Sequence, residues 1–198
     1  MIFFPVMELF YTIQGEGFHQ GKAAYFLRIA GCDVGCIWCD VKDSWSSNYP
    51  KKSINDILTE ITLSSAEIVV ITGGEPTLYD LSQLTVALKN NGIHTHLETS
   101  ASNIITGQWD WICISPKKFK RPLIENMILA NELKIIIYNK SDFLWAEQYA
   151  AMVSNECQLF LQPEWSVKNI MLPNIITYIK KNPKWYLSIQ IHKYIDVP

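Results

Sequence analysis

Apolar and polar positions alternate along the chain in a pattern that predicts strands followed by helices. Short apolar runs such as EIVVIT at 67–72 and LKIIIY at 133–138 are typical of buried strands. Strands are predicted at 23–29, 67–71, 93–98, 110–114, 132–137, 157–161 and 185–190. Apolar residues with a helical period predict helices at 53–63, 78–91, 123–130, 141–152 and 167–182.

Continuous apolar strands that alternate with helices are typical of a parallel sheet covered by helices. The sequence therefore predicts an α/β fold, a partial or modified (β/α) barrel of about six to seven mostly parallel strands. Ser53 is expected to cap the first helix, and Asn91 with Gly92 to end the second. The only linker-like segment is the polar run 44–53, so residues 1–198 are expected to form a single domain.

Composition and charge narrow the function classes. The 198 residues carry a formal net charge of -2, and Lys and Arg are scattered rather than clustered. A small-molecule partner is therefore expected, and nucleic acid is not. The start of the chain, MIFFPVMELF, lacks a basic residue and is interrupted by Glu8, which argues against a secretion signal or a membrane span. We expect a cytoplasmic protein.

Reactive residues follow the predicted strands. The segments after the strands read GCDVGCIWCD, TGGEPT, ETS, SPK, LQP and QIHKY. In parallel α/β folds, ligands bind at the carboxyl ends of the strands. The sequence therefore predicts that the candidate site lies along this rim.

Three cysteines give the clearest chemical signal. Cys32, Cys36 and Cys39 form a CxxxCxxC pattern directly after a strand, with Gly31 and Gly35 allowing the backbone to curl. Iron–sulfur cubanes usually take four cysteines, so three leave one iron for an outside ligand. S-Adenosylmethionine offers its amino and carboxylate groups as a chelate and would place its sulfonium beside the cluster for one-electron cleavage.

A zinc site is the alternative interpretation of this loop, with His19 or Asp40 as the fourth ligand. Cys113 and Cys157 lie inside apolar strands and are expected to be core residues. His94 and His96 face the same side of one strand, an arrangement compatible with a metal pair but more typical of polar positions that find other partners.

The second motif is Thr72-Gly73-Gly74-Glu75-Pro76 at the end of the next predicted strand. Its two glycines expose backbone groups, and its carboxylate is a suitable acceptor for a ligand's ammonium. Alone, this motif is equally typical of an ordinary turn. With the cysteines one strand earlier, it favours a cofactor site.

Together the cysteine loop and GGEP resemble the radical S-adenosylmethionine superfamily. Further segments are similar to the 7-carboxy-7-deazaguanine synthase family, and the resemblance runs from about Glu8 to Pro198. Its most discriminating part is TIQGEG, because glycyl-radical activases, the alternative enzyme class, share the cysteines without it. The other segments that carry it are FHQGKAAYFLRIAGCDVGCIWCD, VVITGGEPTLYDL, LETS, SPK, LQP and LSIQIHKY.

The resemblance implies a homodimeric enzyme that converts 6-carboxy-5,6,7,8-tetrahydropterin to 7-carboxy-7-deazaguanine with loss of ammonia, on the route to queuosine. It implies a 4Fe–4S cluster, S-adenosylmethionine used catalytically, and flavodoxin or ferredoxin as the electron donor. Residues that match the family's pterin-binding positions are Gln14, Glu16, Arg28 and His192. Residues that match its cofactor-binding positions are Gly74, Glu75, Ser100, Ser115, Lys117 and Gln162.

Two positions near the site carry separate expectations. The family commonly has Thr or Ser after the Cys-Asp of the cluster loop, where it contributes to a Mg2+ site, whereas this chain has Val41. A valine side chain has no oxygen for a hard cation, so Mg2+ binding is expected to be weakened. Pro198 follows His192 closely, and its carboxylate is expected to contact the substrate.

Overall fold

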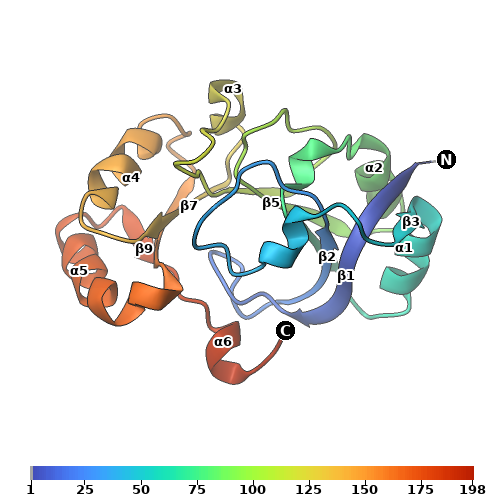
Figure 1. Ribbon diagram of the computed structural model, residues 1–198, viewed down its shortest axis with the longest axis horizontal. Helices are drawn as coiled ribbons and strands as arrows, with labels where there is room; N and C mark the ends of the chain where they lie inside the picture. The colour runs from blue at the N-terminus through green and yellow to red at the C-terminus, as the bar shows by residue number, and fades with distance from the viewer. Residues whose placement is uncertain (1) are drawn as a thin grey trace.

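The structure is a computed structural model that describes residues 2–198, and within them nine strands form one open sheet (Figure 1). The order of strands across the sheet is β3-β1-β2-β4-β5-β6-β7-β8-β9. Their bounds are β1 Phe3–Ile13, β2 Ala23–Ile29, β3 Lys51–Ser53, β4 Ile68–Gly73, β5 His94–Thr99, β6 Trp111–Ile114, β7 Glu132–Ile137, β8 Gln158–Pro163 and β9 Trp185–Leu187.

The parallel part of the sheet confirms the predicted fold class. Every neighbouring pair from β2 to β9 is parallel, and these are the strands that the sequence predicts. Strands β1 and β3 were not predicted. They extend the sheet at one edge, where β1 pairs antiparallel with both β2 and β3.

The helices follow the strands as expected. Ser53 caps α1 through a capping box with Asp56, and α2 ends at Asn91 and Gly92, whose positive φ suits a glycine. The short α6 was not predicted. Helix bounds are α1 Ile54–Thr62, α2 Ser82–Asn90, α3 Ile124–Met127, α4 Asp142–Ala150, α5 Lys168–Lys181 and α6 His192–Ile195. None of the helices within residues 2–198 is both long and apolar enough to cross a membrane.

Alternate residues of each strand separate the hydrophobic core from the inner face of the sheet. On β7, Leu133 and Ile135 belong to the main core with Cys157, while Lys134 and Ile136 line a cavity. Figure 1 shows α1, α2, α4 and α5 around the outside of the sheet, and the segment between β2 and β3 in front of its inner face. The core therefore lies under the helices and leaves the inner face for chemistry.

A histidine pair lies at the amino end of β5. His96 is buried, and its ring centroid lies 4.4 Å from that of His19, in the loop between β1 and β2. The His19 ring also packs against Trp111. The two ring nitrogens of His19 are buried without a hydrogen-bond partner among the described residues. His94, in contrast, is exposed. The pairing of His94 with His96 considered from the sequence is therefore replaced by contact between His96 and His19.

Because of this histidine pair, we expect the folded protein to lose stability in mild acid. Burial lowers the pKa of His19 from 6.5 to about 4 and that of His96 to about 3, so both rings stay neutral in the fold while the unfolded chain takes up protons. The free energy of unfolding should fall as the pH drops from about 6.5 toward 4. Urea unfolding of wild type and His19→Phe measures this slope, and His94→Gln is the control. Equal slopes in wild type and His19→Phe would contradict the assignment.

Candidate active site

A cavity of about 440 Å³ occupies the inner face of the sheet. It brings together every residue that the sequence and its resemblance assign to the cluster, the cofactor or the substrate. Those residues are Gln14, Glu16, Arg28, Cys32, Cys36, Cys39, Gly74, Glu75, Ser100, Ser115, Lys117, Gln162, His192 and Pro198, and Val41 lies beside them. Asp40 also lines this cavity, whereas His19 is not among the lining residues.

The cysteine loop follows β2 and is held by its own backbone. Gly31 and Gly35 have positive φ, and the Gly31 N–H donates to the Ser44 carbonyl at 2.7 Å. The three loop cysteines are free thiols on one cavity wall, the donor set that a cubane with an open iron requires. Burial raises the pKa of Cys36 to about 11, so its thiolate forms with metal binding rather than before it.

Within residues 2–198, no group of three or more His, Cys, Asp or Glu side chains is gathered around the position of a single metal ion. A cubane does not require this arrangement, because each thiolate binds a different iron. The cysteine loop therefore fits a cluster by its donors and its place in the cavity.

The two glycines of GGEP allow the end of β4 to lie close against the end of β2 and the start of the cysteine loop. The N–H of Gly74 donates to the Ile29 carbonyl at 3.0 Å, and that of Glu75 donates to the Gly31 carbonyl at 2.8 Å. A β-carbon at Gly73 would lie 1.9 Å from the Ile29 oxygen, and one at Gly74 would lie 2.2 Å from the Gly31 oxygen. Only glycine permits this close approach of two backbones.

Glu75 is buried and its carboxylate is already well supplied with donors. One oxygen accepts hydrogen bonds from the backbone and hydroxyl of Thr77 and from the Thr99 hydroxyl, and the other accepts from the backbone and hydroxyl of Ser100. These bonds join the ends of β4 and β5. Contact between Glu75 and a ligand's ammonium stays a prediction, and in this structure Glu75 fixes the rim.

Two further cofactor-site candidates are similarly fixed. The Lys117 ammonium donates to the hydroxyl and the carbonyl of Ser115, and burial lowers the pKa of Lys117. Gln162, on β8, accepts a hydrogen bond from the Ser188 hydroxyl at 2.6 Å through its side-chain oxygen. Within residues 2–198 the Gln162 amide N–H groups have no hydrogen-bond partner, so they can donate to a ligand.

Gln14 and Glu16 lie in the loop after β1, a strand that was not predicted. Because β1 runs antiparallel to β2, this loop starts at the amino end of β2, and its side chains reach Glu98 on β5 and Lys134 on β7. They line the cavity because it extends along the inner face of the sheet beyond the rim. The candidate site thus has a deep part in addition to the rim.

An ion-pair network that the sequence did not reveal lies in this deep part. The ammonium of Lys134, with a side chain 5% exposed, lies 2.5 Å from Glu16 and 3.8 Å from Glu98. Gln14 donates to Glu98 at 2.9 Å, and Gln190 donates to Glu16 at 2.8 Å. Burial alone raises the pKa of Glu16, but the attraction of Lys134 outweighs it and lowers the pKa to about 2.

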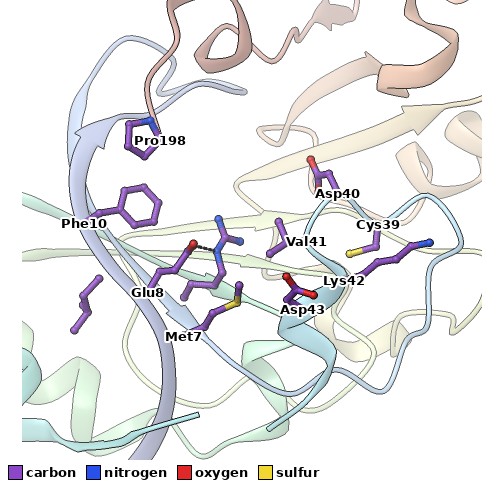
Figure 2. Close-up of a pocket in the computed structure, with 11 residues that line it drawn as sticks. Met7, Glu8, Phe10, Cys39, Asp40, Val41, Lys42, Asp43 and Pro198 are labelled. Carbon is purple, nitrogen blue, oxygen red and sulfur yellow. Dashed lines mark hydrogen bonds and ion pairs between the residues drawn. The ribbon is translucent and has the colours of Figure 1, made fainter. Parts of the chain in front are cut away.

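A second, more open groove of about 970 Å³ continues from the cavity between β1 and the cysteine loop. Figure 2 shows Met7, Glu8 and Phe10 on one wall, and Cys39 through Asp43 on the opposite wall. Arg28 pairs with Glu8 at 2.6 Å through its Nε, which leaves its terminal N–H groups for a ligand. Pro198 lies beside Phe10, and the Thr12 hydroxyl donates to its oxygen at 3.3 Å.

The segment around α6 closes one side of the cavity. His192 lies against Gly15, where a β-carbon would come within 2.2 Å of its ring. Gln190 and Lys193 both donate to Asp40, which joins this segment to the cysteine loop. His192 is therefore positioned between the loop after β1 and the cysteine loop.

Comparison with known proteins identifies the class first. Residues 27–112 match the model of the Radical SAM superfamily, a range that contains both the cysteine loop and GGEP. The fold and the site therefore define a radical S-adenosylmethionine enzyme, a class that uses a 4Fe–4S cluster together with S-adenosylmethionine.

Full-length relatives identify the family within this class. The chain is 52% identical to 7-carboxy-7-deazaguanine synthase of Flavobacterium psychrophilum, over 98% of this chain and 92% of that protein. It is 32% identical to the Escherichia coli K12 enzyme of the same name, over 98% and 99%. The crystal structure of QueE from Escherichia coli superposes with a TM-score of 0.85 at 31% identity, over 95% of this chain and 94% of that one. The chain belongs to the 7-carboxy-7-deazaguanine synthase family.

Proposed function

We propose that the enzyme converts 6-carboxy-5,6,7,8-tetrahydropterin to 7-carboxy-7-deazaguanine with loss of ammonia, as a step toward queuosine and related deazapurines. The observation that supports this most directly is the single cavity that joins the three loop cysteines to Gln14, Glu16, Arg28 and His192. A radical generator and a set of groups suited to a pterin carboxylate and its N–H edge thus face the same space.

The roles of the residues follow from their chemistry. Cys32, Cys36 and Cys39 hold the cluster, which when bound with S-adenosylmethionine supplies the radical that starts the rearrangement. The terminal guanidinium N–H groups of Arg28 bind the substrate carboxylate, because Glu8 occupies only its Nε. Glu16, ionised at neutral pH, accepts hydrogen bonds from the N–H groups of the pterin.

The cofactor is held at the rim of the cavity. Gly74 and Glu75 present the end of β4, and Ser100, Ser115 and Gln162 offer hydroxyl and amide groups from neighbouring strand ends. Lys117 adds a partly buried ammonium beside them. His192 lies with the substrate groups, and Pro198 lies in the groove at the cavity mouth, where contact with the substrate remains a prediction.

The decisive experiment is anaerobic incubation of the reconstituted enzyme with carboxytetrahydropterin, S-adenosylmethionine and a reductant. A new deazapurine chromophore is the expected result. Turnover of the free pterin, with no protein substrate present, separates this function from that of a glycyl-radical activase. Cofactor cleavage without any change in the pterin would overturn the proposal.

Further properties belong to this proposal. Residues 1–198 form a single domain, since one sheet spans the described residues. The enzyme acts as a homodimer, as the family resemblance implies, and it works in the cytoplasm. The even scatter of its charges speaks against nucleic acid. Flavodoxin or ferredoxin supplies the electron. Mg2+ assists through the substrate and water rather than through a side-chain oxygen at position 41.

Val41 gives this last property a test. Its side chain lines both the cavity and the groove but offers no oxygen, while Mg2+ retains several waters and needs few protein ligands. We expect activity to respond weakly to Mg2+ and Val41→Thr to increase the response. Initial rates are measured across a Mg2+ titration after chelator treatment, with Val41→Ala as the matched variant without oxygen. An absolute Mg2+ requirement that Val41→Thr leaves unchanged would show that another group completes the site.

A further inference from the structure

The ion-pair network around Lys134 is unusual for the middle of a buried strand. Lys134 is the third residue of β7, its neighbours Leu133 and Ile135 are fully buried, and its own side chain is 5% exposed. Removing an ammonium from water is costly unless it is paired and hydrogen-bonded. A methionine of similar length would fill the same space without that cost, so the charge itself requires an explanation.

The partners of Lys134 come from distant parts of the chain and all face the cavity. Its ammonium contacts Glu16 from the loop after β1 and Glu98 from β5, and both carboxylates line the cavity with it. Each carboxylate also accepts from a glutamine amide, Gln190 on Glu16 and Gln14 on Glu98. Two carboxylates thus share one ammonium, and acceptor capacity remains on the cavity side.

We propose that Lys134 is a positioning residue for substrate binding: its ammonium fixes the Glu16 carboxylate, so that this carboxylate can accept hydrogen bonds from the N–H groups of the pterin. This inference rests on the proposed function and extends it to a residue outside the set that the family resemblance supplies. Lys134 therefore acts through Glu16. Since the two carboxylates outnumber the one ammonium, the network favours a ligand edge with N–H donors over an edge with oxygen acceptors.

Removing the ammonium should make substrate binding depend on pH. Without Lys134, the burial of Glu16 and its repulsion from Glu98 both favour the protonated carboxyl, which can no longer accept at that oxygen. Binding should then weaken as the pH falls. The other titratable groups that face Lys134 and Glu16 are Glu98, Cys113, Lys117, Glu132 and His192, and they are present in every variant compared.

The test is equilibrium binding of carboxytetrahydropterin to the anaerobic holoenzyme with S-adenosylmethionine and no reductant. For Lys134→Met, the Kd should rise about tenfold or more between about pH 8.5 and pH 6 beyond any change in wild type. Lys134→Arg should follow wild type, because the charge is kept. Lys118→Met is the matched control and should also follow wild type. It removes the ammonium that pairs with the buried Asp142, and neither residue lines the cavity.

A double variant keeps the inference testable if Lys134→Met folds poorly. In Glu16→Gln the carboxylate is already absent, so adding Lys134→Met should weaken pterin binding less than about twofold further. Parallel pH profiles for Lys134→Met and wild type, or additive losses in the double variant, would overturn the role of Lys134. A wild-type enzyme that binds no carboxytetrahydropterin would instead overturn the proposed function, so the two failures are distinguishable.

Discussion

Replacing any one of Cys32, Cys36 or Cys39 by Ala is expected to abolish cleavage of S-adenosylmethionine. These thiols are the three free cysteines of the loop that lines the cavity, and a cubane that keeps one iron for the cofactor needs all three. Reconstituted wild type should hold about four irons and four sulfides per chain. Iron and sulfide analysis and the formation of 5′-deoxyadenosine measure the two effects in each variant.

Cys113 and Cys157 provide the control for this prediction. Both are buried, Cys113 against Glu132 and Cys157 in the main core. Their replacement by Ala should lower the free energy of unfolding by about 1 to 2 kcal/mol, the usual cost of a small change in the core, and leave the iron content unchanged. If either proved necessary for cluster assembly while a loop cysteine did not, the ligand assignment would be wrong.

The parallel strands were predictable from the sequence, but the antiparallel edge was not. Runs such as Ile68–Gly73 are apolar because both faces of the strand are covered, and this pattern is visible locally. Strand β1 contains Pro5, which argues against a strand because it lacks a donor. The structure accommodates it, since the carbonyl of Pro5 still accepts from Ala30 and the backbone of Val6 pairs with Pro50.

The composition of the site was predictable to a similar extent. Motifs and family resemblance supplied residues that all line one cavity, although their individual roles stay predictions. Lys134 was missed because a single charge within an apolar run has no local signal. Its partner Glu16 lies 118 positions away, and only the fold brings the two together. The depth of the cavity was missed for the same reason, because it depends on the direction of β1.

The largest expected effect outside the cysteines is at Gly73, whose replacement by Ala should disrupt the cluster site. Gly73 is directly opposite Ile29 in the pairing of β4 with β2, and its φ is +147°. A β-carbon there would lie 1.9 Å from the carbonyl oxygen of Ile29, a contact that backbone atoms cannot relieve by rotation. The same oxygen accepts from Gly74, so movement of either strand also breaks the link to the cysteine loop.

Gly92→Ala separates the collision from the cost of the backbone conformation. Gly92 also has positive φ, +74°, but a β-carbon there would meet no atom within 4 Å. Gly92→Ala should therefore cost about 1 to 2 kcal/mol of stability through backbone strain alone and retain a full cluster. Gly73→Ala should cost more than about 4 kcal/mol, the range of severe core damage, and should lose iron even where the chain remains folded. Urea unfolding gives the first quantity and iron analysis of the folded fraction gives the second. If Gly73→Ala matched Gly92→Ala in both, the close contact between β4 and β2 would not be what holds the cysteine loop in place.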